Sequence, residues 1–64
     1  MPVITVQMHK TSPEVKATLI RDLTAKAMQA TQLPASAFIV LIDEMADENI
    51  GIGGKTRTEA MAAR

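Results

Sequence analysis

The residue with the clearest chemical potential is Pro2, which stands directly behind Met1. A small residue in this position permits removal of an initiator methionine, and removal would leave Pro2 with a free secondary amine. An α-amino group titrates at about 7.7–8.0 in water, and an apolar pocket lowers that pKa because it disfavours the charged form. A partly neutral amine accepts a proton at physiological pH. Pro2 is therefore the candidate general base.

The other ionisable side chains do not form a familiar catalytic set. The chain has no cysteine and a single histidine, His9, without neighbouring acids at ligand spacing, so we expect no metal site. Asp43-Glu44 and Asp47-Glu48 are adjacent carboxylate pairs. Neighbours on a strand point to opposite faces, so Asp43 and Glu44 are predicted to be a solvated strand end and not a dyad. His9 is interpreted as a surface or interface residue.

A strand and a helix are predicted to position Pro2. Residues 2–8 alternate in polarity, which is typical of a strand, and Pro2 fits its first position because no amide hydrogen is needed there. Ser12 and Pro13 are helix-start residues. Apolar side chains then recur every four residues on an amphipathic helix over 15–31, at Val15, Leu19, Leu23 and Ala27. We expect the helix to end near Gln32, because Pro34 disfavours helical geometry in the residue before it.

The second half of the chain predicts a buried strand and a hairpin. Residues 38–42 are a continuous apolar run, typical of a parallel strand covered on both faces. A polar connection follows, and the three glycines within 51–54 favour a tight hairpin over 50–55. A phosphate-binding loop is the alternative for these glycines, but the full spacing of such loops is missing. Residues 56–64 are interpreted as a frayed helical turn or a tail docked on a neighbour.

Together these elements predict an α/β fold: a single β-α-β unit with a C-terminal β-hairpin, forming one domain over residues 1–64. A chain of 64 residues without cysteine is short for an independent core, and 47% of its residues are hydrophobic. One helix covers only one face of the sheet, and both sheet edges stay open. We therefore expect oligomerisation to complete the sheet.

Charge and composition narrow the partners and the location. Seven Lys and Arg balance seven Asp and Glu, and Phe38 is the only aromatic residue, which argues against nucleic-acid binding. No apolar run reaches the length of about 20 residues that a membrane span requires. No signal peptide is evident, so a cytoplasmic location without membrane association is expected.

At this point the sequence resembles a known family. Pro2 at the head of a strand, residues 14–23, Ile-Asp-Glu-Met at 42–45 and Gly-Ile-Gly-Gly at 51–54 are similar to the small 4-oxalocrotonate tautomerases. These are the short members of the tautomerase superfamily, which carry an amino-terminal catalytic proline. The resemblance extends over nearly the whole chain, with about one residue missing around 10–12.

The resemblance implies both an assembly and an activity. It implies a homo-hexamer built as a trimer of dimers, no cofactor, and a role in aromatic compound catabolism. It also implies a tautomerase, an isomerase of the keto–enol type that moves a proton in an enol or dienol 2-hydroxy acid such as 2-hydroxymuconate. Pro2 matches the family's general base directly.

The resemblance also points to substrate-binding positions. Lys10 and Ile39 stand where family members that act on 2-hydroxymuconate have arginines that grip the carboxylates, and Ile50 replaces an aromatic residue. Lys55 and Arg57, from the same or a neighbouring subunit, are further candidate cations. Two alternatives remain: a related proline-dependent decarboxylase or hydratase, and a non-catalytic small oligomeric binding protein in which Pro2 only begins a strand.

Overall fold

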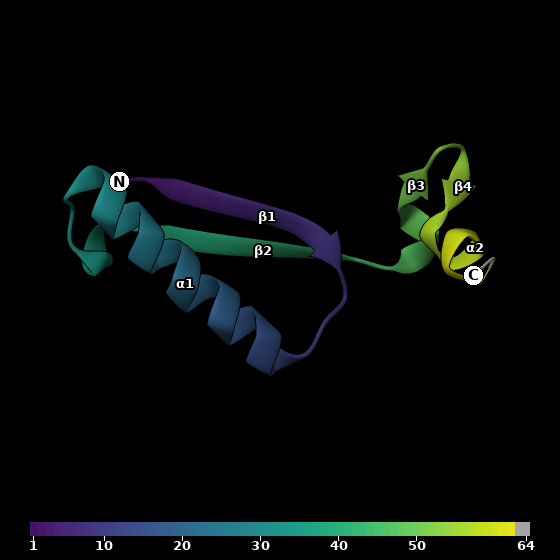
Figure 1. Cartoon of the computed structure of the whole chain (residues 1–64), viewed down its shortest axis with the longest axis horizontal. Coiled ribbons are helices and arrows are strands. Elements are labelled where there is room, and N and C mark those ends of the chain that lie inside the picture. Colours follow the sequence, from purple (N-terminus) through teal and green to yellow (C-terminus); the bar gives the residue numbers. More distant parts are fainter. Residues whose placement is uncertain (63–64) are drawn as a thin grey trace.

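The computed structural model describes residues 1–62 and is dominated by two long parallel strands. Strand β1 (Val3–His9) pairs with β2 (Ile39–Met45) from Val3 opposite Ile39 to His9 opposite Met45. Helix α1 (Pro13–Thr31) and the 3₁₀ turn η1 (Ala35–Ala37) return the chain between them (Figure 1). The predicted β-α-β unit is therefore confirmed.

Helix α1 begins and ends where local sequence requires. The Ser12 hydroxyl oxygen accepts a hydrogen bond from the Val15 amide at 3.2 Å, and Pro13 occupies the first turn. At the other end Gln32 adopts the left-handed conformation, with φ of 62°, and its amide donates to the Met28 carbonyl at 2.9 Å. The predicted end of the helix near Gln32 is confirmed.

The two faces of the β1–β2 sheet differ in what covers them. The Glu44 side chain bonds to Lys16 of α1, so even-numbered side chains of β2 face the helix. Side chains on this helix-covered face are half-buried: Ile4, Val6, Met8, Val40, Ile42 and Glu44. Those on the opposite face are exposed, and we call this set the open sheet face: Val3, Thr5, Gln7, Ile39, Leu41 and Asp43.

Strand β2 differs from the predicted run at both ends. Phe38 lies ahead of the strand, and the strand continues past Ile42 through Asp43 and Glu44 to Met45. Gln7 and Met8 of β1 supply pairing partners for the two acidic residues, so the parallel ladder overrides their low strand propensity. Asp43 is exposed, as predicted for a solvated strand end, whereas Glu44 is half-buried. Their predicted separation is confirmed, since Glu44 faces α1 and Asp43 lies on the open sheet face.

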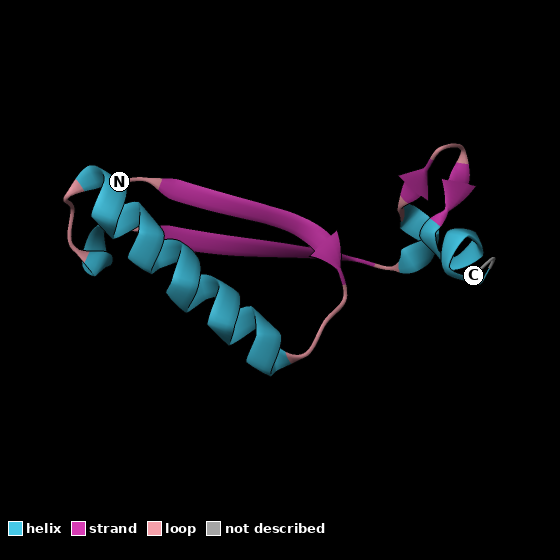
Figure 2. Ribbon diagram, in the orientation of Figure 1, coloured by secondary structure: helices cyan, strands magenta, loops and turns pink. Residues whose placement is uncertain are grey.

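The C-terminal hairpin follows a short 3₁₀ turn, η2 (Asp47–Asn49). Strands β3 (Gly51–Ile52) and β4 (Lys55–Thr56) pair antiparallel around Gly53 and Gly54, whose φ angles are 59° and 84°. Two consecutive residues with positive φ form the tight turn that glycine allows. The predicted hairpin is confirmed, and it stands beyond the far end of the sheet from the N-terminus (Figure 2).

A second helix, α2 (Arg57–Ala62), follows the hairpin directly. The Thr56 hydroxyl accepts from the Glu59 amide at 3.1 Å, and the Glu59 carboxylate accepts from the Thr56 amide at 2.9 Å. This reciprocal pair is a capping box, and it makes the segment a defined helix and not the frayed turn predicted for it. Residues 63 and 64 of the predicted tail lie outside the described residues.

One subunit does not enclose a core. None of the described residues has a buried side chain. The accessible surface is 4718 Å², against about 4,000 Å² expected for a folded monomer of this mass. The radius of gyration is 15.0 Å, against about 11 Å for a compact domain of this length. Because the sheet also keeps one face open, with Val3, Ile39 and Leu41 exposed on it, the fold is completed by oligomerisation.

Candidate active site

Pro2 lies at the head of β1 and is held there by β2. Its carbonyl oxygen accepts a hydrogen bond from the Ile39 amide at 3.1 Å. Pro2 is half-buried, whereas Met1 is 84% exposed. In the chain as printed, Met1 is bonded to the Pro2 nitrogen, which is then a tertiary amide without basicity. The chemistry predicted for Pro2 therefore requires the loss of an exposed residue.

The segment from the last turn of α1 to the first half of β2, which follows Lys26, has no ionisable side chain. The last turns of α1, η1 and the start of β2 lie beside the head of β1 (Figure 1). No residue from 27 to 42 has an ionisable side chain. These residues therefore offer no cation to a substrate carboxylate.

The structure brings together only two of the four predicted site residues. Ile39 lies beside Pro2 and starts β2 on the open sheet face. Lys10 follows the end of β1, so the rise of a strand puts it about 26 Å from Pro2. Ile50 lies between η2 and the hairpin, also beyond the far end of the sheet. Within one subunit, neither Lys10 nor Ile50 reaches Pro2.

The candidate cations Lys55 and Arg57 lie at the same end of the subunit as Lys10, but the three differ in the contacts that they make. Arg57 forms an ion pair with Asp47, with 2.9 Å between Nη1 and Oδ1, and its amide donates to the Ile50 carbonyl at 2.7 Å. This pair fastens α2 to η2. Lys10 and Lys55 are exposed. Among the described residues, Arg57 is the one of these three cations that forms an ion pair.

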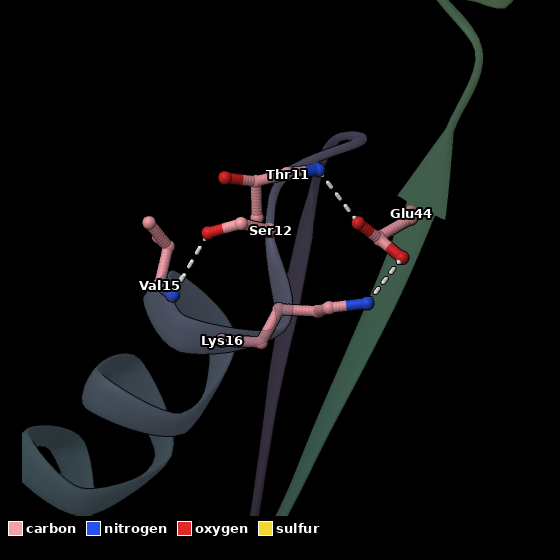
Figure 3. A network of polar contacts seen from close by, with 5 residues as sticks. All are labelled: Thr11, Ser12, Val15, Lys16 and Glu44. Carbon is pink, nitrogen blue, oxygen red and sulfur yellow. Dashed lines mark hydrogen bonds and ion pairs between the residues drawn. The ribbon is translucent and has the colours of Figure 1, made fainter.

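Glu44 makes a contact set that the sequence did not predict. One carboxylate oxygen accepts from the Thr11 amide at 2.7 Å, and the other accepts from Lys16 Nζ at 2.9 Å (Figure 3). The hydrogen bond from Lys16 and then that from Thr11 lower the Glu44 pKa, against partial burial, and the charge of Lys10 adds to the effect. These partners are 28 and 33 residues away, so no local pattern could indicate them.

Three further observations concern the described residues and not the Pro2 region in particular. An open depression of about 290 Å³ lies over the first turns of α1, at the opposite end from Pro2, and is lined by Glu14, Val15, Thr18 and Leu19. Among residues 1–62, no three His, Cys, Asp or Glu side chains gather as metal ligands. No helix within that range is long and apolar enough to span a bilayer.

The arrangement defines a class of protein: small β-α-β subunits with a proline at the head of the first strand and a glycine hairpin at the end. A family model described as tautomerase enzyme matches residues 2–60. The chain belongs to the tautomerase family, and the resemblance noted in the sequence is confirmed.

Solved structures agree with this assignment. TomN, a 4-oxalocrotonate tautomerase homologue in the tomaymycin biosynthetic pathway, is 32% identical with a TM-score of 0.90, and 95% of each chain is covered. Apo unfused 4-OT is 30% identical with a TM-score of 0.87, covering 92% of this chain and 98% of its own. A heterohexamer 4-oxalocrotonate tautomerase from Chloroflexus aurantiacus J-10-fl is 27% identical with a TM-score of 0.80, covering 92% and 95%. No curated protein matches the sequence.

Proposed function

We propose that this protein is a keto–enol tautomerase of a small enol or dienol 2-hydroxy acid, 2-hydroxymuconate or a related compound, with Pro2 as general base. The observation that carries the proposal is the position of Pro2. It heads a strand held by β2, near residues 27–42, which have no ionisable side chain, and Met1 ahead of it is 84% exposed. Removal of Met1 converts its nitrogen from an amide to a secondary amine.

The proposed reaction needs only one group that both accepts and returns a proton. The neutral amine of Pro2 removes the proton from the enol hydroxyl, and the electron pair of that O–H bond forms the ketone. The conjugated double bonds shift, and the protonated amine delivers its proton to a carbon of the chain. The amine ends neutral, so no oxidant, reductant or cofactor enters the balance.

In this proposal, the cation that binds a substrate carboxylate comes from another subunit. The Pro2 end has no ionisable side chain over residues 27–42, and Lys10 lies about 26 Å away along its own strand. We therefore assign Lys10 of a neighbouring subunit to the carboxylate, with Ile39 and Ile50 as apolar lining. A lysine ammonium is a point charge, whereas an arginine guanidinium forms two parallel hydrogen bonds with a carboxylate. We therefore expect the site to accept several carboxylate substrates and not to select one dicarboxylate tightly.

A homo-hexamer, arranged as a trimer of dimers, is the assembly we assign to this site. The open sheet face and the lack of a core in one subunit support self-association. The similarity to the heterohexameric tautomerase supports six as the number of subunits. In such an assembly, the charged end of one subunit meets the uncharged end of another.

The test compares three forms of the protein on 2-hydroxymuconate and phenylenolpyruvate, with ketonisation followed by ultraviolet absorbance. The processed wild type should exceed the uncatalysed rate. A form with extra residues ahead of Pro2, whose nitrogen stays an amide, should lose turnover by about 100-fold or more, the usual contribution of a general base. Asp22→Asn is the control and should retain turnover, because Asp22 is exposed midway along α1, away from both Pro2 and the Lys10 loop.

Intact mass spectrometry establishes which form each sample contains. Equal rates for the processed and extended forms, on both substrates, would contradict the assignment of Pro2 as the base. Turnover of neither substrate by a sample shown to lack Met1 would contradict the tautomerase assignment for this substrate class.

A further inference from the structure

We propose that Glu44 is a positioning residue for substrate binding. It holds the loop between β1 and α1, residues 10–12, so that Lys10 is presented to the site of a neighbouring subunit. The inference rests on the proposed function, because it assigns a purpose to the Lys10 loop of the same site. It gives Glu44 a role in the site. Glu44 faces α1, on the side of the sheet opposite Asp43, and the sequence had predicted it to be solvated.

The geometry shows that the Glu44 carboxylate is fully engaged by this loop and the start of α1. One oxygen takes the Thr11 amide at 2.7 Å, the other takes Lys16 Nζ at 2.9 Å, and the side chain is only 23% exposed. Hydrogen bonds with a charged partner are among the stronger ones in proteins. The carboxylate thus joins strand β2, the loop and the helix at one point (Figure 3).

The anchored backbone directly follows Lys10. Thr11 is bonded to Glu44, and Ser12 is fixed by its own contacts to the helix: its hydroxyl accepts from Val15 and its carbonyl accepts from the Lys16 amide at 3.1 Å. Lys10 itself is exposed and follows the last residue of β1. With a strand on one side and an anchored amide on the other, its backbone has little freedom to move away from an incoming carboxylate.

Glu44 could instead serve only to tie α1 to the sheet through Lys16. The two roles separate because the carboxylate divides its oxygens between two partners. Lys16→Met removes the tie to the helix and leaves the Thr11 bond in place. Glu44→Gln removes the charge and leaves one acceptor oxygen for two donors, so it weakens both contacts.

A double-mutant cycle between Glu44 and Lys10 tests the positioning role through the kinetic constants. Glu44→Gln should raise KM by about ten-fold while kcat stays within about two-fold, the pattern of lost uniform binding. Lys10→Ala should do the same. The double variant should be no worse than Lys10→Ala, because Glu44 acts through Lys10. Asp22→Asn is the matched control: Asp22 is exposed on α1, and its loss of charge should leave KM unchanged.

Amide hydrogen exchange supplies a readout that does not depend on turnover. Thr11 should be protected in wild type and in Lys16→Met, and should lose about ten-fold of that protection in Glu44→Gln. Unchanged Thr11 protection in Glu44→Gln, or KM effects that multiply in the double variant, overturn the positioning role. If processed wild type has no turnover, the kinetic role falls with the proposed function, while the exchange result still reports whether the anchor exists.

Discussion

At the scale of single residues, Pro2 has two backbone connections with opposite consequences for its chemistry. The bond from Met1 to its nitrogen removes basicity. The hydrogen bond from the Ile39 amide reaches its carbonyl oxygen, which methionine removal does not touch. The residue that becomes the amino terminus therefore stays fastened to β2 through its own carbonyl. A chain end that would otherwise fray is held in one place, as a general base requires.

Glu44 gives the loop a defined response to acid. Its contacts lower its pKa below the ordinary value of 4.5, so the folded loop favours the ionised carboxylate more than the unfolded chain does. The stabilisation is complete above 4.5 and is lost as the pH falls through the lower, folded-state pKa. We expect the protection factor of the Thr11 amide to be constant from pH 7 to about 5 and to fall below about 4.5.

Exchange measured over this pH range, and corrected for the intrinsic rate, checks the prediction. The Met28 amide within α1 is the internal reference, since residues 27–42 contain no ionisable side chain. In Glu44→Gln the acid-dependent step for Thr11 should disappear. A step of the same size in that variant would show that another group titrates.

At the scale of the elements, the end of α1 carries a strain that substitution can relieve. Gln32 occupies the left-handed region, which costs an L-residue about 1–2 kcal/mol, whereas glycine adopts it freely. Glycine also has more freedom to lose on folding, an opposing effect of about 0.4–1 kcal/mol. Gln32→Gly should therefore stabilise the protein by about 0.5–1 kcal/mol.

Denaturant unfolding at a fixed subunit concentration measures this difference. Ala25→Gly is the contrasting control, because the same residue in the exposed interior of α1 should destabilise by about 1 kcal/mol. Destabilisation by Gln32→Gly would mean that the side-chain bond from Gln32 Nε2 to the Gln29 carbonyl, 2.9 Å long, outweighs the strain.

The elements also show which parts of the fold the sequence could predict. The alternation of residues 2–8, Ser12-Pro13 and Pro34 are local features, and the structure follows them within a residue or two. The last part of β2 depends on pairing with a strand far away in sequence, so its acidic residues misled the prediction. The helix after the hairpin could have been predicted from the sequence, because Thr56 and Glu59 have the spacing of a capping box.

The candidate site divides in the same way. Pro2 could be singled out from its type and position alone. Glu44 could not, because its partners come from the loop and the helix start about 30 residues earlier. The distance between Lys10 and Pro2 follows from the length of β1 and could be predicted. Which subunit places its Lys10 beside Pro2 depends on contacts between chains, so the sequence of one chain does not predict it.

At the scale of the whole molecule, the subunit is polarised along its long axis of 44 Å. Residues 27–42, at the end with Pro2, carry no ionisable side chain. At the other end, Lys10 follows β1, Lys55 lies in β4 and Arg57 begins α2. One end has the proposed base without a nearby cation, and the other has cations without the base. An assembly that places the two ends of different subunits side by side completes a site that a single chain leaves in halves.

Leu41 tests whether assembly and activity are linked in this way. It is 52% exposed, lies opposite Thr5 and sits within the open sheet face. If that face is covered by other subunits, Leu41→Lys buries an unpaired ammonium group, at a penalty of several kcal/mol per ion. We expect sedimentation velocity at micromolar concentration to show an oligomer for wild type and smaller species for Leu41→Lys. Turnover should fall together with assembly although Pro2 is intact, because Lys10 of a neighbouring subunit no longer lies beside it.

Ala17→Lys adds the same charge to the exposed surface of α1 and should leave both assembly and turnover unchanged. A monomeric wild type, or a Leu41→Lys variant that sediments as wild type does, would exclude the open sheet face as the surface that completes the fold.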